Sequence, residues 1–206
     1  MAGVQKTLIM LWALAAPAPL LAQAMVPGGE ALPDGPVTEP VEQSRPNHDE
    51  ELGILLERLA QEDAPAPERI EQRVIELWSE SGSDTADLLL RRGQDALNAE
   101  DYEAAVEHFS ALIDHEPEFA EAWNARATTF FMMDLPGLSV PDIEHTLALN
   151  PKHFGALAGL GIILEQTGEL KGALAAYRAA QALNPHREQV NDSVERLAAE
   201  VDGPDI

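Results

Sequence analysis

The chain has 206 residues, 45% of them apolar and 24% charged, which is enough for one ordinary domain with flanking segments. Thirteen lysines and arginines stand against 36 aspartates and glutamates, so the formal net charge at pH 7 is −23. A surface this negative repels nucleic-acid phosphates and anionic lipid headgroups, which argues against both as partners. The chain has no cysteine, and this excludes disulfides, thiolate metal sites, cysteine nucleophiles and a lipid anchor on cysteine.

Residues 1–24 have the pattern of a secretory signal peptide. Lys6 precedes an uncharged apolar run over residues 7–16, and the small residues of Ala22-Gln23-Ala24 suit cleavage before Met25. The alternative is an uncleaved membrane anchor, but the run is short and two prolines follow it, so it fits a hydrocarbon core of about 30 Å poorly. We therefore expect export across the inner membrane. Arginine exceeds lysine and alanine is abundant, as in bacteria with GC-rich genomes, and this composition alone favours the periplasm over the extracellular space.

Residues 25–48 are predicted to be a disordered, acidic linker. They hold five prolines and three glycines among several acids, with few large apolar side chains. Such a segment buries too little surface to offset the entropy of ordering it. A recognition peptide in polyproline conformation is the weaker alternative, because no PxxP motif with flanking basic residues stands out.

Apolar residues recur at helical spacing in two runs within residues 49–82. The stretch at 64–67, which holds two prolines, separates the runs, and Ser81-Gly82-Ser83 closes the second one, so the pattern predicts a helical hairpin. The apolar residues are Leu52, Leu55, Leu56 and Leu59 in the first run and Ile70, Val74, Leu77 and Trp78 in the second. No alternating strand pattern occurs between residues 49 and 201, so the predicted fold class is all-α.

A fixed period organises the next part of the chain. Pro117, Pro151 and Pro185 stand 34 residues apart, and each closes a helix-like segment. Small and large residues repeat in the same register. The first helix of each unit has Leu89, Trp123 or Leu157 before Gly93, Ala127 or Gly161, and the second has Ala105, Ser139 or Ala173 before Phe109, Ile143 or Tyr177. This period, with two helices in each unit, resembles the tetratricopeptide-repeat family.

The resemblance implies a right-handed superhelical solenoid in which antiparallel helix pairs stack on one another. Three repeat units fall within residues 83–187. Their expected bounds are 86–119, 120–153 and 154–187.

The ends of the array are predicted to be caps. The hairpin at 49–82 lies one period upstream and in phase, but Glu71 stands where a small residue belongs, so we expect a degenerate unit that caps the first repeat. At the other end, residues 188–202 predict one more amphipathic helix, a C-terminal cap. Its apolar residues are Val190, Val194, Leu197 and Val201.

The middle repeat departs from the pattern through Pro136 and Pro141. A proline inside a helix costs about 3 kcal/mol. We therefore expect the second helix of this repeat to start late, with Ser139 as its N-cap, Asp142 completing a capping box, and Pro141 in the first turn. The connection at 133–138 is then predicted to be a longer loop than in the other repeats.

The resemblance also implies where a partner binds, because the first helix of each repeat lines the concave groove of such a solenoid. Carried over by position, the groove residues are Leu90, Gln94, Leu97, Asn98, Glu121, Asn124, Thr128, Phe131, Met132, Ile162, Glu165 and Gln166. Amides suit an extended peptide backbone, and the apolar members suit its side chains. For Phe131 and Met132 a place in the core is an equally open alternative.

One known binding mode is absent from the sequence. Family members that grip the C-terminal carboxylate of a chaperone place lysine, arginine and asparagine in the groove. This sequence has Leu90, Gln94, Ala125, Gly155 and Gly159 at those positions, so we do not expect it to bind such a tail.

No catalytic, cofactor or metal site is predicted. The six histidines are scattered, and none pairs with another at the i+3 or i+4 spacing of a helical metal site. Phosphate-binding loops, nucleophile elbows and redox motifs are missing. The run Asp142-Ile143-Glu144-His145 holds two acids and a histidine, and it is expected to be a solvated outer face.

The sequence thus favours a non-catalytic protein–protein adaptor of the cell envelope that binds a peptide or helix of a partner protein in the groove. A self-assembling structural module is the alternative, with Trp78 buried at a contact between subunits. An enzyme is the third and least favoured hypothesis. The sequence identifies neither the partner nor the oligomeric state.

Overall fold

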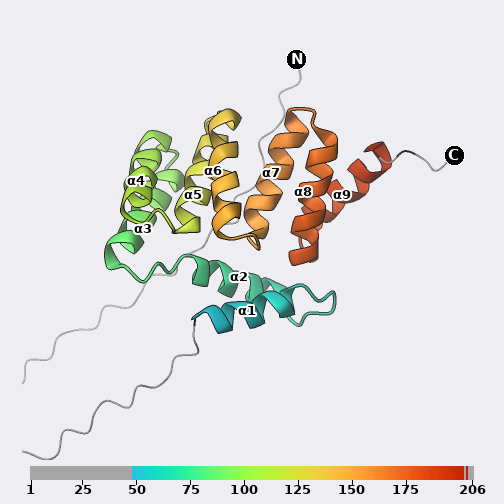
Figure 1. The fold of residues 1–206 in the computed structure, drawn as a ribbon, viewed down its shortest axis with the longest axis horizontal. Helices are drawn as coiled ribbons and strands as arrows, with labels where there is room; N and C mark the ends of the chain where they lie inside the picture. Colours follow the sequence, from blue (N-terminus) through green and yellow to red (C-terminus); the bar gives the residue numbers. More distant parts are fainter. Residues whose placement is uncertain (1–47, 202, 204–206) are drawn as a thin grey trace, which may run out of the picture. The chain divides into compact units, whose positions relative to one another are not determined.

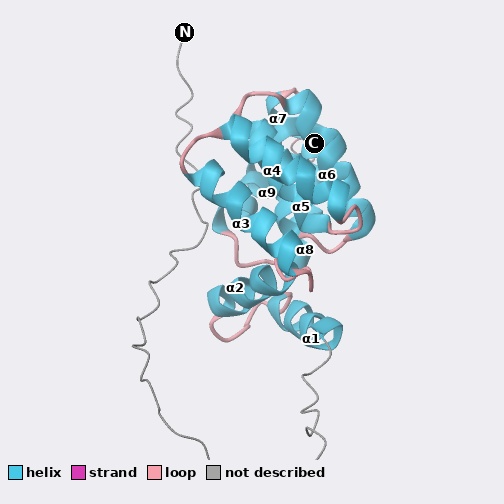
Figure 2. Cartoon of the chain, turned by 90° about the vertical axis from the view of Figure 1, so that its left-hand side faces the viewer, coloured by secondary structure: helices cyan, strands magenta, loops and turns pink. Residues whose placement is uncertain are grey.

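The computed structural model describes residues 48–201 and residue 203, and this part of the chain contains nine α-helices and no strand (Figures 1 and 2). The helices are α1 (His48–Leu59), α2 (Pro67–Trp78), α3 (Asp84–Asn98), α4 (Tyr102–His115), α5 (Ala120–Met132), α6 (Pro136–Leu149), α7 (Phe154–Gln166), α8 (Leu170–Leu183) and α9 (Glu188–Val201). The all-α prediction is confirmed. The signal peptide and the linker up to residue 47 lie outside the described residues.

Helices α3 to α8 form three antiparallel pairs that follow one another in a row, with α9 at the end (Figure 1). The predicted small and large residues meet within each pair. A Cβ atom built on Gly161 comes within 2.7 Å of the Tyr177 ring, and one on Gly93 clashes with the Phe109 ring. These two glycines therefore let an aromatic side chain of the second helix lie against the backbone of the first.

The C-terminal helix α9 packs on α8. Val190 and Leu197 are buried in one cluster with Ala173, Leu174 and Tyr177. Its other face carries exposed polar side chains, among them Asp192, Glu195 and Glu200. Apolar surface at this end of the row is therefore covered by a helix whose outer side suits water.

The α1–α2 hairpin forms as the sequence predicted, but it lies elsewhere than on the first repeat. Its buried residues share a cluster with Phe154 at the start of α7 and with the partly buried Leu183 at the end of α8. The Trp78 ring stacks on His153, with ring centroids 4.4 Å apart and an interplanar angle of 17°. Both views show the hairpin lying across the ends of the other helices (Figures 1 and 2). The expectation of a unit that caps α3 is therefore wrong.

Polar contacts explain this position of the hairpin. The Glu71 carboxylate accepts hydrogen bonds from Arg187, at 2.6 and 3.0 Å, and from the Asn184 amide at 2.9 Å. The ring of His186 pairs with the carbonyl oxygen of Gln61 at 2.9 Å. The sequence showed Glu71 only as a misfit in the repeat pattern. In the structure the same side chain binds the hairpin to the turn between α8 and α9.

The second helix of the middle repeat also differs from the prediction, because α6 begins at Pro136 rather than near Ser139. Proline is compatible with the first helical position, so the helix starts in register with α4 and α8. Ser139 is buried and donates a hydrogen bond to the carbonyl oxygen of Ala127 at 2.7 Å instead of capping the helix. Pro141 lies inside the helix on its exposed side. Only residues 133–135 connect α5 to α6, so the predicted long loop is absent.

Candidate functional site

The twelve residues predicted for the groove all lie on α3, α5 and α7, but they differ in accessibility. Three of them are buried, six are half-buried and three are exposed. The buried ones are Leu90, Glu121 and Asn124; the half-buried ones are Gln94, Leu97, Thr128, Phe131, Ile162 and Glu165; the exposed ones are Asn98, Met132 and Gln166. The nine accessible residues occupy equivalent positions in the three helices, near their C-terminal ends. We call these nine the groove row.

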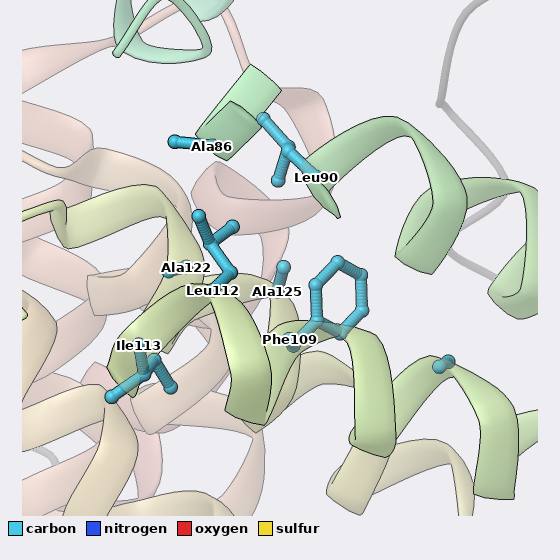
Figure 3. Packing of buried hydrophobic residues seen from close by; sticks show 8 residues of the cluster. Ala86, Leu90, Phe109, Leu112, Ile113, Ala122 and Ala125 are labelled. Atoms are coloured by element: carbon cyan, nitrogen blue, oxygen red, sulfur yellow. The ribbon is translucent and has the colours of Figure 1, made fainter. Parts of the chain in front are cut away.

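Leu90 belongs to the core rather than to a binding surface. Its side chain is 3% exposed and lies in one cluster with Phe109, Leu112 and Ala125 (Figure 3). This corrects the prediction for Leu90. The repeat pattern indicated the helix correctly, but it gave no measure of how deeply α4 covers this turn of α3.

Glu121 and Asn124 are part of a buried hydrogen-bond network. The Glu121 carboxylate accepts from the Asn124 amide at 3.2 Å and lies 3.0 Å from Nε2 of His153. Nδ1 of His153 accepts the backbone N–H of Ala156 at 3.0 Å, so Nε2 is the nitrogen that carries a proton and donates to Glu121. These side chains join α5 to the start of α7, and they have no room to contact a partner.

His153 is a structural residue that the sequence reasoning did not single out. It is the N-cap residue of α7 and is 3% exposed. Its position just before a predicted helix was a possible signal, because such positions favour side chains that accept a backbone N–H. Its partner Glu121 lies 32 residues away, and nothing in the local pattern indicated that contact.

A second network fixes α5 against its neighbours. The Arg126 guanidinium makes two hydrogen bonds to Asp142 of α6, at 2.7 and 2.9 Å, and one to Ser110 of α4 at 3.1 Å. Asp142 is therefore buried in an ion pair, whereas His145 is exposed and packs on the Trp123 ring. The solvated face expected at residues 142–145 holds for His145 and is wrong for Asp142.

Glu165 is engaged within the protein. It accepts a hydrogen bond from the hydroxyl of Tyr177 at 3.2 Å and pairs with Arg196 of α9 at 2.9 Å. Burial, and then the nearby Glu165 carboxylate, raise the pKa of Tyr177 above its usual value. The phenol therefore stays protonated and remains a donor to Glu165.

A small cavity lies between the hairpin and the turns that precede α5 and α7. Its volume is about 170 Å³, and Trp78, Glu80, Phe119 and His153 are among the residues that line it. Sites for drug-sized ligands occupy roughly 300–1,000 Å³, so this cavity is too small for such a ligand. The described residues contain no group of three histidine, aspartate or glutamate side chains placed to hold a metal ion. Within the same residues, no helix is long and apolar enough to cross a membrane.

The stacked helix pairs define a class, the α-helical repeat proteins, in which similar units stack in an array. The model of the Tetratricopeptide repeat family matches residues 90–132 and 138–188. These two stretches of the chain are tetratricopeptide repeats.

Known proteins with the same repeats include a TPR repeat-containing protein of Rhizobium etli. It is 38% identical over 125 residues, which make up 59% of this chain and 61% of that protein. Two solved structures share the fold. The values given first belong to the first structure named below: TM-scores of 0.56 and 0.54, identities of 18% and 19%, and coverage of 58% and 57% of this chain and 95% of each of those chains. They are the first TPR of Spaghetti bound to an HSP90 peptide, and the Yersinia enterocolitica type III secretion chaperone SycD in complex with a peptide of the translocator YopD.

Proposed function

We propose that this protein is a non-catalytic adaptor of the bacterial cell envelope that binds a segment of a partner protein along the groove row. Tetratricopeptide repeats typically mediate protein–protein interactions, and the structural neighbours SycD and Spaghetti are seen with peptides. The observation that carries the proposal is the groove row itself. The same three positions are accessible in α3, α5 and α7, which supports a binding strip shared by the three helices.

The chemistry of the groove row suits an extended peptide. Gln94, Asn98 and Gln166 carry amides that both donate and accept hydrogen bonds, as a peptide backbone requires. Leu97 and Phe131 are half-buried beside them and offer apolar contacts. Peptide recognition in general combines such backbone contacts with pockets for side chains.

The groove row favours a partner other than an acidic chain terminus. It contains no lysine or arginine, and its one charged member, Glu165, is a carboxylate. Two of the positions that the carboxylate-binding members use for polar side chains hold Leu90 and Ala125 here, and both are buried.

The place in the cell envelope rests on the signal-like pattern of residues 1–24. Fractionation of the source bacterium tests it directly. We expect the chain in the periplasmic fraction after osmotic shock, shortened by about 24 residues by mass spectrometry. Full-length chain in the cytoplasmic fraction would contradict export.

The self-assembly alternative loses the contact on which it was based. Trp78 is 9% exposed and packs on His153 and Phe154 of the same chain. The Trp78 contact that was expected between subunits is made within one molecule.

The groove proposal is tested by capture from envelope extract, with mass spectrometry of the retained proteins. The test variant is Gln94→Ala/Asn98→Ala/Gln166→Ala, which removes three amides from half-buried or exposed positions. Glu107→Ala on the exposed side of α4 is the matched control. We expect a small set of proteins that the wild type and the control retain and the amide variant loses. Equal retention by all three would contradict binding along the groove row.

A further inference from the structure

The turns that join the two helices of each repeat share one backbone conformation. Their middle residues are Glu100, Asp134 and Gly168, which stand 34 residues apart and have positive φ angles of 59°, 64° and 84°. Each turn has three residues between its helices. Because the backbone is the same in all three, the fold does not dictate differences between their side chains.

The middle turn differs sharply from the other two in chemistry. Met132, Leu135 and Leu138 are 38%, 39% and 51% exposed. The equivalent positions hold Asn98, Asp101 and Ala104 in the first repeat and Gln166, Glu169 and Gly172 in the third. We call Met132, Leu135 and Leu138 the apolar turn. It contains three of the five large apolar side chains that are exposed in the described part of the chain.

The apolar turn does not serve the fold. None of its three residues belongs to a buried cluster or packs against one, whereas the neighbouring Phe131 and Val140 do. At the position of Leu135 the first repeat has Asp101, whose carboxylate accepts the backbone N–H of Ala104 at 3.2 Å and caps α4. Leu135 gives α6 no side-chain cap. The middle repeat therefore lacks the capping contact of the first repeat, as α8 does after Glu169, and of these three turns only the middle one exposes large apolar side chains.

Acidic side chains flank the apolar turn on both sides. Glu100 and Asp101 belong to the preceding turn and Glu169 to the following one, and all three are exposed. The α5–α6 and α7–α8 turns lie together at the top of Figure 1, on the edge opposite the hairpin. The α3–α4 turn occupies the same edge, because the three antiparallel pairs stack in one orientation. The edge thus presents an apolar centre between acids, and the exposed Lys171 lies two residues after Glu169.

We propose that the apolar turn is a second docking surface, and that it binds a basic amphipathic helix of a partner protein. Apolar side chains of such a helix would cover Met132, Leu135 and Leu138, while lysines or arginines on its flanks would face Glu100 and Glu169. The methionine adds a flexible contact that adapts to different partners. An anionic membrane is disfavoured by the same acids. A second copy of this chain is disfavoured because it would bring two acidic edges together.

The test measures binding of a synthetic helix of about 15 residues, with leucines on one face and lysines on the other. A second helix with glutamate in place of lysine is the charge control. The full chain is compared with Met132→Asn/Leu135→Asp/Leu138→Ala, which gives the middle turn the residues of the first. This variant gains one negative charge, so attraction by charge alone would strengthen, whereas docking on the apolar turn predicts binding weakened by about tenfold or more.

Two further variants make the result specific. Ile54→Asn/Leu88→Asn removes the two large apolar side chains exposed elsewhere, and we expect the affinity to stay within about twofold of the wild type. Glu100→Gln/Glu169→Gln removes two of the three flanking charges and is expected to lower the affinity several-fold and to flatten its dependence on salt. Circular dichroism confirms that each variant keeps its helices.

Several outcomes would overturn the proposal. The first is equal affinity of the wild type and the apolar-turn variant for the lysine helix. The second is that the wild type binds the glutamate helix as tightly as the lysine helix. The third is that the wild type associates with phosphatidylglycerol vesicles, or with itself in light scattering, and that the apolar-turn variant loses this association. The occupant of the apolar turn would then be lipid or a second copy of the chain. Met132 belongs to both surfaces, but Leu135 and Leu138 lie outside the groove row. The amide variant Gln94→Ala/Asn98→Ala/Gln166→Ala is expected to bind the lysine helix normally, so the two proposals can fail separately.

Discussion

The two edges of the helix row are built from turns of similar length, yet they have opposite surfaces. On one edge the turns that follow the second and third repeats hold the buried polar side chains His153 and Asn184, and the α1–α2 hairpin covers them. On the other edge the turns within repeats are open, and the middle one exposes Met132, Leu135 and Leu138. At the first edge His153 and Asn184 are hydrogen-bonded inside the molecule, while Nε1 of Trp78 is buried there without a hydrogen-bond partner. The second edge has apolar surface that the described part of the chain does not cover. We therefore assign a structural role to the first edge and a binding role to the second.

The largest effect is expected from breaking the covered edge at Trp78. Trp78→Ala removes the ring that stacks on His153 and should lower the free energy of unfolding by about 3–5 kcal/mol, as for other buried tryptophans. Urea denaturation followed by circular dichroism measures the change. Trp78→Phe keeps an aromatic ring and should be markedly milder; equal loss in both variants would show that the stack contributes little.

The buried histidine of the same edge comes next. His153→Ala removes the N-cap of α7 and leaves the Glu121 carboxylate without one of its two donors, so we expect a loss of about 2–3 kcal/mol in the free energy of unfolding. His153→Asn restores a capping side chain that is too short to reach Glu121. It should recover about 1 kcal/mol by urea denaturation. No difference between alanine and asparagine would contradict the capping role.

The ion pair that joins the hairpin to the last turn has a smaller expected effect. Glu71 and Arg187 are both partly exposed, with side-chain exposures of 22% and 32%, so water screens their attraction. Glu71→Gln should therefore cost about 1 kcal/mol of stability. A double-mutant cycle with Arg187→Met checks the pairing. Strictly additive effects of the two changes would mean that the contact adds nothing.

The smallest expected change in the free energy of unfolding concerns the open edge, and it is an increase rather than a decrease. Leu135→Asp should stabilise the protein by about 0.5–1 kcal/mol, because an aspartate at this position caps the helix as Asp101 caps α4. Thermal unfolding should show a rise in Tm. Leu135→Ala, which neither caps nor exposes a large side chain, is the control and should lie close to the wild type. A fall in Tm for Leu135→Asp would indicate that Leu135 supports the fold.

The sequence predicted the repeat fold well, because its determinants lie close together in the chain and recur. Gly93 faces Phe109 and Gly161 faces Tyr177 within single repeats, so a period of small and large residues was sufficient to predict the pairs. Pro136 was misread, since the sequence alone does not show whether a proline stands before a helix or at its first position.

The parts that the sequence could not predict depend on contacts between distant residues. Glu71 pairs with Arg187 across 116 positions, and His153 meets Glu121 across 32. For the groove, the repeat register placed all twelve predicted residues on the right helices. It could not show that Glu121 and Asn124 face inward, because both polar side chains are satisfied by each other and by His153.

The position of the hairpin also has a mechanical consequence. In an array of repeats each unit contacts only its neighbours, so the spacing between distant units is free to change when the array bends. The hairpin is fixed to His153 through Trp78 and, one repeat further on, to Arg187 through Glu71. The hairpin therefore fixes the distance between the turn before α7 and the turn after α8. This makes the third repeat stiffer than its own two helices would be.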